Sequence, residues 1–248
     1  MNILSLVLAF GVFSTTVHAK VNFDRKENMR DLTLKTGKEN DLRTYRVFTK
    51  KSLPFPATTV LKSVVDFESR CNNDYKNKRE FLDQKTNCKF HQSNLIETFV
   101  VKDLNPGWLP DEGESERYLL GHRTYNRGVS SFYELVQIYH GQNKQGQKTY
   151  TVSQRMLTDK EVSSLTHAKM HKDSSFKESQ VKFILTEMSP TETQLKYVYQ
   201  ASTQHWLLNK ELLVPQVFSS ITQSINDLVA AVTSGSENGS RSIASEHN

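Results

Sequence analysis

The spacing of apolar residues changes along this chain, and the change limits the folds open to it. Between residues 95 and 201, Val, Ile, Thr, Tyr and Phe alternate with polar residues in segments separated by Gly, Asn and Pro. Alternation with a period of two predicts antiparallel strands. From residue 214 to 232 the apolar residues recur every three or four positions, which predicts an amphipathic helix of about five turns.

An early strand and helix precede the strand-rich part of the chain. The strand is expected at 41–48 and the helix at 56–69, where Pro56 suits the first turn because its missing N–H costs nothing there. Further strands are expected at 95–104, 117–125, 129–140, 148–157, 180–188 and 193–201, and 158–178 predicts a long polar loop with or without a helical turn. One apolar face of such a sheet needs a cover, and the last helix supplies it. The pattern therefore predicts an α+β domain over residues 41–232.

The N-terminus resembles a targeting segment. Residues 1–19 carry no Lys, Arg, Asp or Glu, and an apolar run from Ile3 to Phe13 precedes Val17-His18-Ala19, a cleavage site for a secretory signal peptide. An uncleaved anchor is the alternative, but the run is short for a bilayer span. We therefore expect an exported protein, either periplasmic or secreted.

Polar segments flank the predicted domain. Residues 20–40 are expected to form a polar leader, and residues 233–248, rich in Ser, Gly, Asn and Glu, a flexible tail. The net charge of +5 comes from scattered basic residues and permits contact with anionic surfaces. The lack of a long charge-free run after the N-terminus excludes a protein with several membrane spans.

The chain has two cysteines, Cys71 and Cys88. In an exported protein such a pair most simply forms one disulfide, which would stabilise the polar, Lys-rich segment between them by about 3 kcal/mol. A redox pair is the other reading, but the sequence has no Cys-x-x-Cys motif.

Two segments resemble the START and Bet v 1-like superfamily. Residues 55–68, with Pro56, Val60 and Asp66, resemble the family's first helix, and residues 189–199 resemble its last hairpin. Pro215 opens the terminal helix as a proline does in START domains. The resemblance implies a helix-grip fold, in which a curved antiparallel sheet of about six to seven strands wraps around a long C-terminal helix. It also implies a hydrophobic cavity, without naming a ligand or a catalytic set.

The turn at residues 126–128 would pair Tyr125 with Val129, and this register sets which side chains share a face. The opposite face carries Arg117, Arg123, Lys182, Lys196 and Gln200, so the more apolar set is expected to point inward. We predict that this set lines a ligand site: Tyr118, Leu120, His122, Phe132, Glu134, Val136, Tyr150, Val152, Gln154, Phe183 and Tyr197, with Phe218 and Ile221 from the terminal helix. A filled core made of the same residues is the alternative.

Glu134, His122 and Gln154 are polar members of this face. A buried carboxylate needs a partner or a raised pKa, so Glu134 is expected to bind a ligand's polar group or to face solvent at a strand end. Nucleophile-elbow, Walker-type and dinucleotide-binding motifs are absent. His167 and His171 are four residues apart without a third ligand, so we expect no metal site and no cofactor.

These features favour a monomeric exported protein that binds a lipid or other apolar molecule in an internal cavity and carries it between membranes. The basic clusters at Lys50-Lys51 and 76–79 are solvated surfaces or sites of transient contact with an anionic membrane, and Trp108 is a candidate lip residue. Nucleic-acid binding has little support. Two other functions stay open: a cyclase-like or hydrolytic enzyme with Glu134 or His122 as acid or base, and a secreted interaction module with a filled core.

Overall fold

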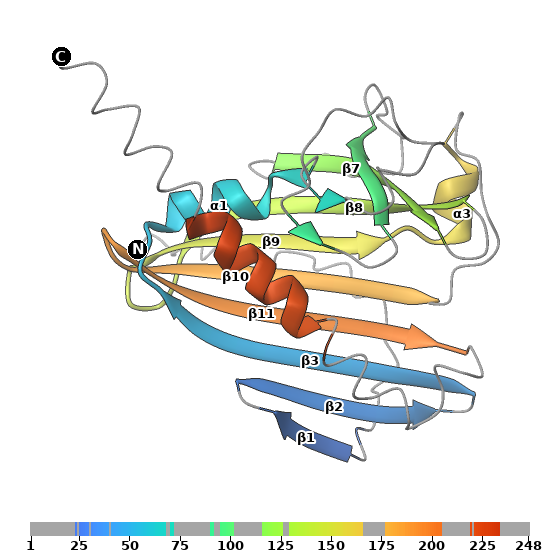
Figure 1. The fold of residues 1–248 in the computed structure, drawn as a ribbon, viewed down its shortest axis with the longest axis horizontal. Helices are drawn as coiled ribbons and strands as arrows, with labels where there is room; N and C mark the ends of the chain where they lie inside the picture. The colour runs from blue at the N-terminus through green and yellow to red at the C-terminus, as the bar shows by residue number, and fades with distance from the viewer. Residues whose placement is uncertain are drawn as a thin grey trace, which may run out of the picture.

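The fold is that of a computed structural model (Figure 1). The structure describes residues 23, 25–29, 31–39, 41–67, 70–71, 90–91, 95–101, 116–125, 129–165, 177–204, 219 and 221–233. Within these residues, no helix has the length and apolar character needed to cross a membrane. The expected signal peptide, Phe218, Trp108, Cys88, the histidine pair and the C-terminal tail beyond residue 233 lie outside the described residues.

The main feature is a nine-stranded antiparallel sheet with the order β1-β2-β3-β11-β10-β9-β8-β7-β6. Its strands are Arg25–Met29 (β1), Leu32–Glu39 (β2), Leu42–Leu53 (β3), Leu95–Val100 (β6), Glu116–Tyr125 (β7), Val129–Gln142 (β8), Lys148–Met156 (β9), Glu178–Ser189 (β10) and Glu192–Thr203 (β11). A separate parallel pair joins Arg70–Cys71 (β4) to Phe90–His91 (β5). Each strand predicted from the alternation falls on an observed one, with ends that differ by a few residues.

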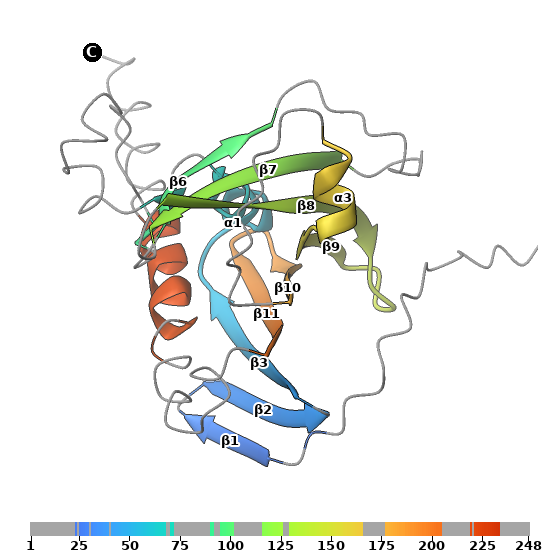
Figure 2. The same ribbon diagram turned by 90° about the vertical axis from the view of Figure 1, so that its right-hand side faces the viewer.

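Two helical segments lie on the concave side of the sheet (Figure 2). Helix α1 covers Ala57–Val64 with Pro56 as its N-cap, so it is shorter than the predicted 56–69. Residues 221–233 form the second segment. The predicted start of this helix, near Pro215, lies outside the described residues, and its full length of about five turns stays a prediction.

The predicted register is confirmed in β7 to β11. Tyr125 pairs with Val129, and the cross-strand pairs place Leu120 beside Glu134, Val136 beside Gln154, and Phe183 beside Tyr197. These side chains share the concave face, which we call the inner face. The sequence therefore predicts correctly which residues share this side of the sheet.

Apolar side chains of the inner face form the core with the helices. Val60, Val64 and Phe67, in or just after α1, pack in one cluster with Leu228 and Val232 of the C-terminal segment. The sheet contributes Leu120, Val136, Ile138, Val152, Leu185 and Leu195 to the same cluster. A second cluster joins Ile221 and Ile225 to Leu32, Leu34, Tyr45, Val47 and Tyr197. Part of the predicted ligand-lining set is therefore packed against helix.

The polar leader predicted at 20–40 is wrong in its local structure, because residues 25–39 form β1 and β2. The inward positions of β2 are Leu32, Leu34 and Thr36, which are buried, and Lys38, which is exposed at the end of the strand. Only two of them are apolar, and the neighbouring strand β1 is almost entirely polar, so the alternation in this segment is weak. The sheet consequently has more than the six to seven strands expected.

The outer face of β7 and β8 is also less polar than predicted. Leu119, Tyr133 and Leu135 point outward there and are buried against Leu157, Val162 and Leu165. Val162 belongs to α3 (Asp159–Ser163), a short helix within the segment predicted as a polar loop. A small second core therefore lies outside the sheet.

A capping box starts α3. The Thr158 hydroxyl accepts a hydrogen bond from the Glu161 backbone N–H, and the Glu161 carboxylate accepts one from the Thr158 N–H at 2.8 Å. Arg155 of β9 donates to both oxygens of the same carboxylate, at 2.7 and 2.9 Å. Burial opposes ionisation of Glu161, but the hydrogen bonds from Arg155 and Thr158 outweigh it and hold its pKa below the usual value. These contacts fasten α3 to the sheet.

We expect Gly121→Ala to destabilise the fold by about 1–3 kcal/mol, because a methyl group at this position would overlap the Phe99 ring on the neighbouring strand. Urea unfolding of the purified protein measures the loss. The control is the same substitution in a Phe99→Ala background, where it should cost little. An equal cost with and without the Phe99 ring would contradict this explanation.

Candidate functional site

A buried, hydrogen-bonded histidine–glutamate pair lies on the inner face of the sheet. His122 of β7 and Glu134 of β8 are diagonal neighbours, since Leu120 is the residue directly opposite Glu134. The His122 Nε2 and Glu134 Oε2 atoms are 3.0 Å apart, and the two residues are only 4% and 8% exposed. Glu134 is therefore buried beside a protein partner, not exposed to solvent at a strand end, and its contact with a ligand stays a prediction.

Thr98 of β6 extends the pair into a three-residue chain. Thr98 lies directly opposite His122, and its Oγ1 atom is 3.0 Å from His122 Nδ1. Phe132 stacks on the imidazole, with ring centroids 4.5 Å apart and planes at 15°. Both ring nitrogens are therefore bound and the ring plane is fixed. We call this chain of Thr98, His122 and Glu134 the polar chain.

The polar chain can hold more than one protonation state. A carboxylate at Glu134 accepts the Nε2–H of His122, which satisfies the charge that burial would otherwise penalise. The Thr98 hydroxyl can donate to a neutral imidazole or accept from a protonated one. A polar group that enters this region therefore meets an acceptor and a donor that are already oriented.

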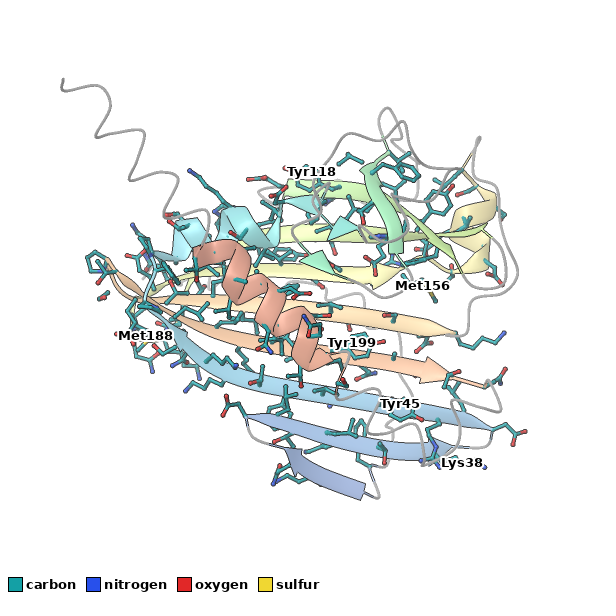
Figure 3. The ribbon with its side chains drawn as sticks, in the orientation of Figure 1. Lys38, Tyr45, Tyr118, Met156, Met188 and Tyr199 are labelled. Carbon is teal, nitrogen blue, oxygen red and sulfur yellow. The ribbon has the colours of Figure 1, made fainter. Side chains whose placement is uncertain are left out.

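Three further side chains share the inner face with the polar chain, and two of them, Gln154 and Tyr199, are polar. Gln154 of β9 lies on the inner face beside Val136 and is buried. Met156, in the same strand, lies directly opposite Glu134, at the end of β9 away from Tyr118 (Figure 3). Tyr199 of β11 is on the same face, because it pairs with Val181, which itself pairs with Gln154.

Tyr199 is held in its neutral form. Burial raises the pKa of its hydroxyl to about 12; a hydrogen bond with Ser179 works in the opposite direction, and the negative charge of Glu134 adds to the rise. At neutral pH Tyr199 is therefore protonated and able to donate a hydrogen bond. The pKa of Tyr199 therefore depends on the charge of Glu134, although the two residues lie on different strands.

The inner face also holds the remaining predicted ligand-lining residues that the structure describes. Leu120, Val136 and Val152 are fully buried, and Phe132, Tyr150 and Phe183 are partly buried. Tyr118 is near the opposite end, where its hydroxyl donates to Glu116 at 3.0 Å, and its pKa is raised by burial and by that carboxylate. The ligand-binding role of the set stays a prediction.

Thr98 is the site residue that the sequence reasoning missed. It lies in a strand predicted from its alternation, two positions from Ile96 and Val100, but a threonine in a strand is too ordinary to single out. Among the residues that the structure describes, no group of three or more His, Cys, Asp or Glu side chains could hold a metal ion.

The architecture and register define a class of fold. The curved antiparallel sheet with helical segments on its concave side is a START-like α+β fold, as the sequence resemblance implied. Human STARD10 superposes with a TM-score of 0.50 at 14% identity, over 89% of this chain and 77% of that one.

Two other solved structures are also similar to this chain. Human StAR-related lipid transfer protein 5 has a TM-score of 0.47 at 12% identity, over 88% of each chain. A fragment of a STAR-related lipid transfer protein from Xanthomonas axonopodis has a TM-score of 0.46 at 12% identity, over 84% of this chain and 96% of that one. No family model matches the sequence. No curated protein matches it either.

We expect Glu134→Gln to lower the Tyr199 pKa from about 12 toward 10 without reaching it, because burial, the largest cause of the shift, remains. Since the pKa is raised on folding, Tyr199 contributes stability below pH 10 that is lost as the pH rises through about 12. NMR titration of tyrosine labelled at the ring carbon measures the shift. Tyr118, whose acidic neighbour is Glu116, should not move; an unchanged Tyr199 would show that Glu134 carries no charge.

Proposed function

We propose that this protein binds a lipid or another apolar molecule with one polar end on the inner face of its sheet. The apolar part of the ligand would lie along the face between sheet and helix, where burial contributes roughly 25 cal/mol per Å². The polar end would meet the polar chain and Tyr199. The observation that carries this proposal is the buried His122–Glu134 pair within an apolar face.

The cost of the pair supports a binding role. Burying polar or charged side chains costs free energy that their mutual hydrogen bonds only partly offset, and apolar residues of similar volume often give a fold that is equally or more stable. The polar chain is therefore a poor choice if the inner face served stability alone. A ligand with a hydroxyl, amide or similar group would use the hydrogen-bonding capacity that this arrangement keeps in an apolar setting.

The fold is consistent with this proposal. Two of the similar structures are named as lipid transfer proteins. We propose that this chain likewise carries its ligand between membranes, with a transient contact to an anionic membrane surface, and acts as a monomer without a cofactor.

One observation favours an enzyme as the second candidate. The polar chain places a hydroxyl, an imidazole and a carboxylate in sequence, with 3.0 Å at each contact. This order of groups can activate a hydroxyl or move a proton. A hydrolytic or cyclase-like reaction on the bound ligand would use Glu134 or His122 as acid or base.

We expect apolar molecules to copurify with the protein and Glu134→Gln to reduce their amount by about tenfold, because one good polar contact is worth about 1.4 kcal/mol. Solvent extraction and mass spectrometry measure the bound material. Glu178→Gln, at an exposed glutamate at the start of β10 in the same sheet, is the matched control and should change nothing. A wild-type protein without extractable apolar molecules, even after incubation with lipid extract, would refute the proposal.

The same experiment separates the two candidates. If the extracted molecule is chemically altered in the wild type, and Glu134→Gln stops the alteration while binding persists, the protein is an enzyme and the proposed carrier function is wrong. An unaltered molecule in both proteins supports the carrier.

We also propose that the chain is exported, with residues 1–19 as its signal peptide, and that Cys71 and Cys88 form a disulfide. The proposal of a disulfide rests on the sequence, because Cys88 lies outside the described residues. Alkylation of the denatured, unreduced protein should leave its mass unchanged, and prior reduction should add two labels. Two labels without reduction would contradict the disulfide.

A further inference from the structure

The outer face of the sheet carries a set of lysines and one arginine that is unusual in its arrangement. The set spans β1, β2, β3, β11 and β10, and no described helix lies over it (Figure 2). We call it the cationic face: Lys26, Lys35, Arg46, Lys50, Lys182 and Lys196.

Several of these cations lie directly opposite one another. Lys26 pairs with Lys35, and Lys35 pairs in turn with Arg46. Further along, Lys50 pairs with Lys196. Like charges in directly opposed positions destabilise a sheet, and neighbouring strands are only about 4.8 Å apart. The cationic face is therefore arranged at the expense of stability.

Few acidic groups neutralise this charge. Among the described side chains on this part of the outer face, the acidic ones are Glu178 and Glu192, at the starts of β10 and β11. Glu192 accepts a hydrogen bond from Ser52. No ion pair to Lys26, Lys50 or Lys196 is present within the described part of the chain. Arg46 is oriented by two hydrogen bonds to Gln200 and lies over the Phe23 ring.

Apolar side chains lie between the cations. Phe48 and Val198 are directly opposite each other, between the Arg46 position and the Lys50–Lys196 pair, and both are partly exposed. Ile184 is opposite Lys196, and the same cross-strand row continues to Tyr139, which is 40% exposed. The face thus combines positive charge with apolar groups.

We propose that the cationic face docks on an anionic phospholipid membrane. A bilayer surface presents negative headgroups above an apolar layer, so it can neutralise the opposed lysines and also receive Phe48 and Val198. A soluble polyanion would satisfy the charges but leave the apolar groups in water. The cationic face is then the surface through which the protein makes the membrane contact of the proposed function. It rests on surface charge, so it can fail while ligand binding on the inner face holds.

The test is sedimentation with vesicles of phosphatidylcholine containing 30% phosphatidylserine, compared with pure phosphatidylcholine. Wild-type protein should bind the anionic vesicles and be released by salt. Each basic residue near an anionic surface contributes about fivefold to binding. Lys35→Glu with Lys196→Glu removes two positive charges and adds two negative ones, so binding to the anionic vesicles should weaken by about a hundredfold or more. Equal binding by the variant and the wild type would overturn the proposal.

This pair of substitutions should not destabilise the fold. Each new glutamate faces a cation, Lys26 and Arg46 in one case and Lys50 in the other, so the thermal midpoint should stay the same or rise. The matched control is Lys144→Glu with Lys160→Glu, at two exposed lysines in the β8–β9 turn and in α3. It changes the net charge by the same amount. If the control lost binding to the same extent, the effect would come from net charge alone, and the proposal that the cationic face binds the membrane would be refuted.

A reporter at Phe48 distinguishes a membrane from another polyanion. Phe48→Trp should shift its emission to the blue on anionic vesicles and be quenched by brominated lipid, after subtraction of the wild-type spectrum. Equal affinity for heparin, with no emission change on vesicles, would assign the face to a soluble polyanion and overturn the membrane proposal. The amount of ligand extracted from the Lys35→Glu, Lys196→Glu variant should match the wild type, which keeps this test separate from the ligand experiment.

Discussion

The packing of the inner face against helix is the constraint on which the structure depends. A sheet with one apolar face is stable only when that face is covered, and Leu228 and Val232 of the C-terminal segment share a cluster with Leu120 and Val136 from the centre of the sheet. Helix α1 covers the same face through Val60 and Val64. The curvature of the sheet follows from this arrangement, because the strands wrap toward the helices that they contact (Figure 2).

The polar chain is an exception within this apolar packing. Its three members come from adjacent strands, so the sheet holds their backbone atoms at fixed spacing and a loop movement does not disturb them. Stacking on Phe132 fixes the imidazole in the remaining direction. A rigid sheet therefore presents a preorganised set of hydrogen-bonding groups, which lowers the ordering cost of binding a polar group.

The pairing of β7 with β8 could be predicted from the sequence because only three residues separate the two strands. The turn predicted from the sequence there pairs Tyr125 with Val129, as observed, and alternation then assigns each side chain to a face. Local sequence carries both signals. The turn and the alternation alone are enough to place His122 and Glu134 on the same face of neighbouring strands.

Other features depend on information that no local segment carries. The two N-terminal strands contain few apolar residues, so their place in the sheet comes from pairing with β3 rather than from their own pattern. The second core under α3 needs Leu119 and Leu135, outward-facing residues whose cover lies in a polar segment. The opposition of Lys50 and Lys196 exists only because β3 pairs with β11, two segments far apart in the chain.

That central pairing has a kinetic consequence. Tyr45 pairs with Ala201, so the middle of the sheet closes only when the beginning and the end of the chain meet. Contacts between such distant segments are slow to form, because the entropy of closing a long loop must be lost before they stabilise anything. During synthesis, the first three strands can associate as a ribbon but must wait, with one edge open, until nearly the whole polypeptide has emerged. A chain built this way completes the middle of its sheet late, when its last strand is available to pair with its third.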